Sequence, residues 1–204
     1  MTKLTHSGAE FMSELLGCHS NFKDDISSEL HPSEYHAAWQ NELVEEFGED
    51  VASIDQSRHY AIEVPDRIDG YGRLIQGDGD YIVKLRGSQD RDKAVINQAV
   101  REPRVAAEAH LRGDSDMFAE IIGVESDYKW VVMEQVEPRD LDRDRRTERR
   151  SEYRDKGWMP KDSEFGRTDD GRTVCYDYGL FDRLEWEVQR EDIPYEDAFP
   201  LFSL

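Results

Sequence analysis

Short apolar or alternating segments follow one another through the middle of the chain and predict β-strands. The segments are Tyr60–Val64, Gly72–Gln76, Tyr81–Leu85, Ala119–Val124 and Trp130–Gln135. Asp-Gly-Tyr-Gly and Gly-Asp-Gly-Asp separate the first three and are typical of hairpin turns. We therefore expect these five segments to form one antiparallel sheet, with a further hairpin at Gly171–Asp177.

Longer segments with apolar residues three or four positions apart predict helices on both sides of the strands. Residues 1–55 are expected to be helical, and Asp92–Arg112 predicts a helix that is broken or restarted at Pro103. A highly charged helix is expected at about 139–156 and a last helix at about 180–190. The whole pattern predicts an α+β protein.

The order of these elements predicts three regions. Residues 1–55 form a helical amino-terminal region, and residues 56–137 form a small antiparallel sheet with a packed helix. Residues 138–204 hold the charged helix, the last hairpin and a carboxy-terminal tail.

The charge balance is strongly acidic. The chain has 46 Asp and Glu against 26 Lys and Arg, a net charge of −20, and only 7 of the basic residues are Lys. Such a charge disfavours a compact state in dilute buffer, but at molar salt the Debye length falls to about 3 Å and the repulsion is screened. Because 8 Phe, 4 Trp and 9 Tyr argue against a disordered chain, we expect a globular protein from a halophile.

Composition also excludes several classes of protein. No apolar run reaches the roughly 20 residues of a membrane span, and the negative charge disfavours binding to nucleic acid. Cys18 and Cys175 are too few for a disulfide framework. The amino terminus lacks the apolar stretch of a secretory signal. We therefore expect a cytoplasmic location in a halophile, or a place in a virion.

Four motifs occur in an informative order. Lys84 lies in the predicted strand Tyr-Ile-Val-Lys-Leu, and Glu102 follows 18 residues later in the next predicted helix. Val131–Val136 (Val-Val-Met-Glu-Gln-Val) forms another strand, and Asp177-Tyr178-Gly179 follows the last hairpin. This order and spacing resemble the protein-kinase-like fold, over residues 58–185 of this chain.

The resemblance implies roles for individual residues. Lys84 would hold nucleotide phosphates, Glu102 would pair with Lys84, and Asp177 would bind magnesium. The backbone of Met133, Glu134 and Val136 would receive adenine, and Gly70 and Gly72 would form a reduced glycine-rich loop. The alternatives are a purely structural Lys84–Glu102 pair and an Asp177 that only caps a turn.

The catalytic loop departs from the family pattern. Counted back from Asp177, the position of the catalytic Asp falls on Met159 and that of the metal-binding Asn on Glu164. A thioether can neither accept a proton nor orient a hydroxyl group. We therefore expect a non-catalytic, pseudokinase-like interaction or assembly module. The alternative is a small phosphotransferase that uses ATP and Mg²⁺, with Asp155 or Asp162 as an unorthodox base.

One face of the charged helix is lined with arginine. The stripe consists of Arg139, Arg143, Arg146, Arg150 and Arg154, with acidic residues on the opposite face. Because guanidinium groups suit the recognition of carboxylates, we expect this helix, with the chain ends, to contact a protein partner or another copy. The alternative is a solvated, salt-bridged helix.

Overall fold

The protein is an α+β protein in the computed structural model, which describes residues 3–25, 32–54, 60–85, 98–125, 129–138, 143–158 and 164–178. The described helices are α1 (His6–Asp25), α2 (Pro32–Phe47), α3 (Gln98–Arg112) and α4 (Arg143–Asp155), with a 3₁₀ turn η1 (Ser115–Met117). The strands are β1 (Ala52–Ser53), β2 (Tyr60–Val64), β3 (Arg67–Ile68), β4 (Gly72–Arg73), β5 (Tyr81–Leu85), β6 (Ile121–Val124), β7 (Trp130–Glu134), β8 (Glu137–Pro138), β9 (Phe165–Arg167) and β10 (Thr173–Cys175).

A five-stranded antiparallel sheet forms the centre of the fold, in the order β1-β2-β5-β7-β6. Four of the five predicted strands lie in it, with Lys84 of β5 opposite Ala61 of β2 and Val131 of β7. The prediction for Gly72–Gln76 was wrong, because β4 pairs with β3 in a separate two-stranded sheet. Gly70 and Gly72 both adopt positive φ angles. Glycine adopts such angles without steric cost, which suits the tight turn between β3 and β4.

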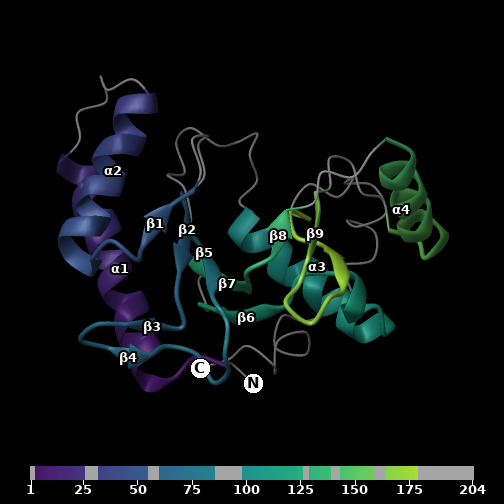
Figure 1. Ribbon diagram of the computed structural model, residues 1–204, viewed down its shortest axis with the longest axis horizontal. Coiled ribbons are helices and arrows are strands. Elements are labelled where there is room, and N and C mark those ends of the chain that lie inside the picture. The colour runs from purple at the N-terminus through teal and green to yellow at the C-terminus, as the bar shows by residue number, and fades with distance from the viewer. Residues whose placement is uncertain are drawn as a thin grey trace.

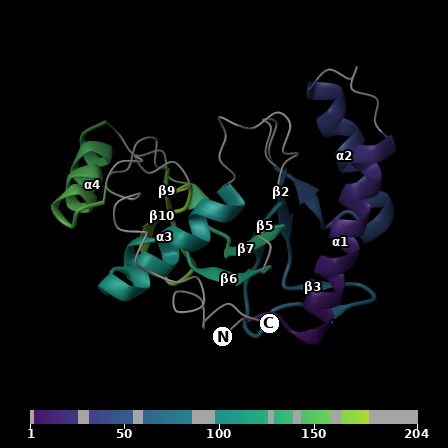
Figure 2. The same cartoon turned by 180° about the vertical axis from the view of Figure 1, so that it is seen from behind.

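The central sheet is covered on both faces. Figures 1 and 2 show α1 and α2 beyond one face and α3 beyond the other. Alternate residues of β5 belong to the first core: Tyr81, Val83 and Leu85 pack with the apolar side chains of α1 and α2. Lys84 lies between Val83 and Leu85 on the strand and therefore points to the α3 face. The strand alternation thus separates an apolar face from a face that bears charge.

The helices α1 and α2 share a core with the sheet rather than standing apart from it. Phe11 of α1 packs edge-on against Phe47 of α2 and against Tyr71 of the β3–β4 turn. Gly8 approaches the backbone of Leu74 so closely that an added Cβ would lie 2.1 Å from the Leu74 carbonyl oxygen. The first turn of α1 is therefore in direct contact with the backbone that follows β4.

The remaining elements differ from the predictions in their limits. The helix α3 runs through Pro103 without a break, although proline at this sixth position removes one intrahelical hydrogen bond. The last hairpin is built from β9 and β10, and β8 extends it to a three-stranded sheet. The segment 180–190, the tail and residues 139–142 lie outside the described residues. In the part of the chain that is described, no helix is long and apolar enough to cross a membrane.

The close approach at Gly8 makes a testable prediction. We expect Gly8→Ala to lower the free energy of unfolding by about 1–3 kcal/mol, because the new methyl group must displace backbone. Gly17→Ala is the matched control in the same helix, where a Cβ meets nothing within 4 Å, and it should stabilise the protein by up to about 1 kcal/mol. Urea unfolding measures both, and equal effects of the two substitutions would contradict the packing of α1.

Candidate functional site

A buried ion pair joins the central sheet to α3. Lys84 Nζ on β5 donates a hydrogen bond to Glu102 Oε1 on α3, with 2.5 Å between the atoms. The Glu102 side chain is fully buried, whereas 14% of the Lys84 side chain remains exposed. The two residues that the family resemblance predicts to pair are therefore in direct contact, and the lysine side chain is not completely buried.

A second carboxylate lies beside the same lysine. Asp177 follows β10, and its Oδ1 lies 4.0 Å from Lys84 Nζ. With 27% of its side chain exposed, Asp177 is the most accessible of the three groups. We call Lys84, Glu102 and Asp177 the charged cluster.

The electrostatics of the charged cluster depend on burial. Burial raises the pKa of Glu102 to about 7, although the charge of Lys84 and the backbone N–H of Tyr178 work in the opposite direction. For Lys84, burial lowers the pKa, but the nearby carboxylates of Glu102 and Asp177 outweigh it and leave the pKa raised. Lys84 is therefore a cation near neutral pH, with carboxylates on two sides.

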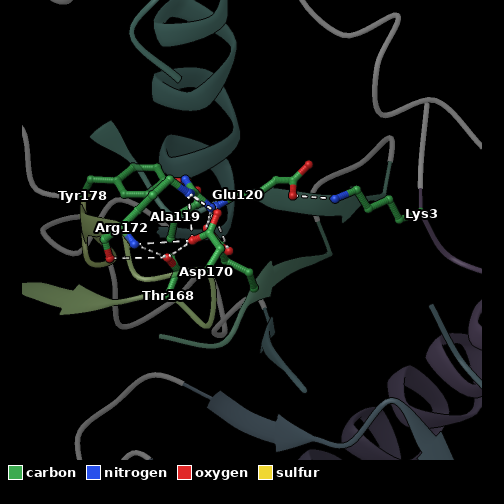
Figure 3. A network of polar contacts seen from close by, with 8 residues as sticks. Lys3, Ala119, Glu120, Thr168, Asp170, Arg172 and Tyr178 are labelled. Atoms are coloured by element: carbon green, nitrogen blue, oxygen red, sulfur yellow. Dashed lines mark hydrogen bonds and ion pairs between the residues drawn. The ribbon is translucent and has the colours of Figure 1, made fainter. Parts of the chain in front are cut away.

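The residue after Asp177 is firmly anchored. Tyr178 is 1% exposed, and its hydroxyl donates a hydrogen bond of 2.9 Å to the carbonyl oxygen of Ala119 (Figure 3). Its ring packs edge-on against Phe118, with 5.1 Å between the centroids. The Asp-Tyr-Gly motif is thus attached to the segment between η1 and β6.

A surface network holds the β9–β10 hairpin against β7. Arg172 pairs with Asp170 in the hairpin turn and with Glu134 at the end of β7. Hydrogen bonds from Thr168 and Arg172 lower the pKa of Asp170 to about 2. Figure 3 shows this group beside Ala119 and Glu120, and Glu120 also pairs with Lys3 near the amino terminus. The network therefore holds in place the hairpin whose second strand, β10, directly precedes Tyr176 and Asp177.

The predicted adenine-binding segment is closely packed against that hairpin. A second core lies on the α3 side of the sheet, and Met133 is buried in it together with Val131 and Phe165. Val136 is also buried, and a Cβ on Gly166 would lie 2.3 Å from Val136 Cγ1. The carboxylate of Glu134 accepts a hydrogen bond from the backbone of Glu120 and contacts Arg172. Its side chain is therefore committed to the surface network.

The predicted glycine-rich loop does not join the charged cluster. Gly70 and Gly72 flank Tyr71, which packs on Phe11 and donates a hydrogen bond to Glu14 of α1. Because α1 covers the face of the sheet opposite to Lys84, the Gly70–Gly72 turn is placed away from the lysine. The sequence pattern of this turn reflects its tight geometry and not phosphate binding.

The proposed alternative bases differ in position. Asp155 is exposed at the end of α4, and no polar contact among the described residues joins it to the charged cluster. Met159 and Asp162 lie outside the described residues. Glu164, at the position of the family's Asn, is exposed and accepts a hydrogen bond of 2.6 Å from the hydroxyl of Tyr176.

The arginine stripe lies on a helix with one deeply buried side chain. Arg146 and Arg154 of α4 are exposed and Arg150 is half-buried, whereas Arg143 is described only in its backbone and Arg139 lies outside the described residues. Tyr153 is 2% exposed. The helix is therefore in contact with the core of its own chain, because the Tyr153 ring packs on Phe118 and Phe165.

A second anchor that the sequence analysis missed follows α4. Asp114 is 9% exposed and accepts hydrogen bonds from Lys156 Nζ at 2.7 Å and Trp158 Nε1 at 3.0 Å. Arg112, at the end of α3, lies over the Trp158 ring at 4.6 Å. The only sequence signal was a Trp next to a Lys-Gly pair, which does not predict a partner about 40 residues away.

Metal ligands are sparse among the described residues, which contain no group of three or more His, Cys, Asp and Glu side chains suited to a metal ion. A single carboxylate such as Asp177 nevertheless fits magnesium that arrives with a nucleotide, because Mg²⁺ is commonly held by one or two carboxylates together with phosphate oxygens.

No protein-family model matches this chain, and neither curated proteins nor solved structures provide a match.

The raised pKa of Glu102 predicts a dependence of stability on pH. The folded state holds the Glu102 proton more tightly than the unfolded state, in which the pKa is about 4.5. The free energy of unfolding, relative to that of Glu102→Gln, should therefore fall as pH rises from about 4.5 to 7. The slope should be up to about 1.4 kcal/mol per pH unit, and the difference should be level above pH 7.

Urea unfolding of both proteins at a series of pH values, in buffer of constant high ionic strength, measures this difference. Glu148→Gln on the exposed surface of α4 is the control and should shift stability by no more than about 0.5 kcal/mol at every pH. A difference for Glu102→Gln that does not change between pH 5 and 7 would show that burial does not perturb this carboxyl group.

Proposed function

We propose that this protein is a non-catalytic member of the protein-kinase-like fold that binds a magnesium nucleotide and serves as an interaction module. The observation that supports the proposal is the charged cluster, in which Lys84 contacts Glu102 at 2.5 Å and lies 4.0 Å from Asp177. The resemblance in sequence assigns these same three residues to nucleotide binding.

The chemistry of the cluster suits phosphate. Lys84 has 14% of its side chain exposed, and Glu102 holds its ammonium group in a fixed direction. A cation that is oriented in advance loses little freedom when it meets an anion, which favours binding. Asp177 adds a partly exposed carboxylate 4.0 Å from this ammonium group, and Mg²⁺ is commonly held by one or two carboxylates together with phosphate oxygens.

The same residues do not supply a general base. Asp177 and Glu102 both face a lysine, and Met159 stands where the family keeps its catalytic Asp. Without a carboxylate that orients the acceptor hydroxyl, the chemical step loses the contribution of general base catalysis, typically 10²- to 10⁴-fold. Nucleotide binding without phosphate transfer is therefore the function that we propose.

The interaction surface in this proposal is the exposed part of the arginine stripe of α4, which consists of Arg146 and Arg154, whereas Arg150 between them is half-buried. Both side chains lie in the exposed class. Figure 1 shows α4 at the far end of the molecule from α1 and α2. In a chain of net charge −20, such a face fits an acidic surface on a protein partner or on another copy. Close guanidinium–carboxylate contacts also survive the concentrated salt for which the composition is suited.

The nucleotide prediction is tested by thermal unfolding in high-salt buffer. Magnesium ATP should raise the melting temperature of the wild type, because a ligand that binds only the folded state stabilises it. Lys84→Arg and Asp177→Asn, which preserve charge and size respectively, should each reduce the shift by more than half. Lys129→Ala and Asp169→Ala, which change exposed residues elsewhere, are the controls and should leave it unchanged.

Assays of phosphate release and transfer on the same samples distinguish nucleotide binding without turnover from phosphotransferase activity. We expect no release or transfer of the γ-phosphate above background. Turnover that is lost in Asp177→Asn would favour the alternative, a small ATP-dependent phosphotransferase. The absence of any melting shift with the wild type would reject nucleotide binding and leave Lys84–Glu102 as a structural pair.

The arginine face is tested by charge reversal. Arg146→Glu together with Arg154→Glu should abolish self-association, as measured by sedimentation velocity over a concentration series, and leave the circular dichroism spectrum unchanged. Asp144→Lys together with Glu148→Lys reverses two exposed charges on the opposite face and is the matched control. Equal self-association of the two double variants would mean that Arg146 and Arg154 form no contact between copies of this protein.

A further inference from the structure

Tyr153 differs from every other described side chain of α4. It is 2% exposed, whereas the other side chains described in this helix are exposed or, for Arg149 and Arg150, half-buried. The attachment of the helix to the body of the protein therefore depends heavily on one aromatic residue. Burial raises the pKa of the Tyr153 hydroxyl, so the group remains a neutral donor and acceptor.

The hydroxyl of Tyr153 joins two backbone groups that are far apart in the sequence. It donates a hydrogen bond to the carbonyl oxygen of Met117 and accepts one from the backbone N–H of Cys175, at 3.1 Å. Cys175 ends β10, which is an edge strand of its sheet. Tyr153 thus satisfies a backbone donor that a neighbouring strand would otherwise have to satisfy.

Cys175 lies two residues before Asp177, and this short stretch is held at both ends. On one side, Cys175 is bound by Tyr153 and by the backbone N–H of Ala119, which donates to the Cys175 carbonyl oxygen at 2.9 Å. On the other side, Tyr178 is anchored to Ala119 and Phe118. Asp177 lies between the anchored residues Cys175 and Tyr178, and its carboxylate is 4.0 Å from Lys84 Nζ.

The aromatic rings make the connection stiff. Phe118 contacts three other rings edge-on, those of Tyr153, Trp158 and Tyr178, with centroids 5.0–5.5 Å apart. Edge-on aromatic pairs contribute about 0.5–1.5 kcal/mol each beyond the burial of their surface. A displacement of α4 therefore changes the surroundings of Tyr178 as well as the hydrogen bond to Cys175.

We infer that Tyr153 is a positioning residue for Asp177, and that through it α4, the helix with the arginine face, is coupled to the charged cluster. The inference rests on the proposed function, because Asp177 matters there as the carboxylate that holds magnesium. A partner that binds the arginine stripe therefore acts on a helix whose buried Tyr153, unlike the other side chains described in it, forms a hydrogen bond with the backbone N–H of Cys175. Reciprocally, magnesium nucleotide at Asp177 favours the docked position of Tyr153.

Tyr153→Phe tests this inference, because it keeps the ring and removes only the hydroxyl. Tyr71→Phe is the matched control: it removes a tyrosine hydroxyl that binds the Glu14 carboxylate, outside the Cys175–Tyr178 segment. The first measurement is hydrogen exchange of the Cys175 amide. We expect exchange to be at least tenfold faster in Tyr153→Phe and unchanged in Tyr71→Phe.

The second measurement compares the affinity for ATP with and without magnesium. Tyr153→Phe should weaken the binding of magnesium ATP roughly five- to tenfold, the effect of about one hydrogen bond. It should leave the affinity for ATP in excess EDTA unchanged, because Lys84 is not displaced. A purely structural role would weaken both affinities alike.

The outcomes of the two measurements are separable. Unchanged exchange at Cys175 would overturn the inference whether or not nucleotide binds. Faster exchange with an unchanged preference for magnesium would also overturn it, since Tyr153 would then hold the backbone without positioning the carboxylate. A wild type that binds no ATP would refute the proposed function. The exchange measurement would still decide whether Tyr153 holds the segment before Asp177.

Discussion

The buried ion pair between Lys84 and Glu102 is the interaction on which the arrangement of the other parts depends. Both charges are removed from most or all of their water, and such a pair is costly to break, because the remaining charge stays buried without a partner, at about 3–5 kcal/mol. The pair therefore fixes α3 against β5. With the helix in place, the segment between η1 and β6 holds Phe118 and Ala119 where they contact Tyr178.

The sheet separates two environments. On the side of α1 and α2 it is apolar, and alternate residues of β5 contribute to that core. On the side of α3 it presents Lys84, and the β8–β9–β10 sheet closes the second core with Phe165, Val174 and Cys175. The charged cluster thus lies on the α3 side of a sheet whose other face is covered by α1 and α2.

The chain combines the charged cluster with an unusual surface. Lys84, Glu102 and Asp177 lie together, and Met159 stands at the position that the resemblance assigns to the catalytic Asp. The helix that precedes this position bears the arginine stripe, and the hydroxyl of its Tyr153 binds the backbone of Cys175, two residues before Asp177. The function that we propose, in which nucleotide binding is communicated to a binding helix, requires these features and does not require turnover.

The sequence by itself determined what depends on local periodicity: the α+β class and four strands of the main sheet. The contact between Lys84 and Glu102 was predicted from the resemblance to the protein-kinase-like fold, and local periodicity alone does not give it. The sequence did not determine that β4 lies outside the main sheet, because a strand pattern of two or three residues does not specify which strand it pairs with. Only the tertiary structure decided the role of Tyr153, since its hydroxyl contacts backbone groups 22 and 36 residues away. In a helix made almost entirely of charged residues, one aromatic leaves no periodic signal, and its partners are set by how the chain packs.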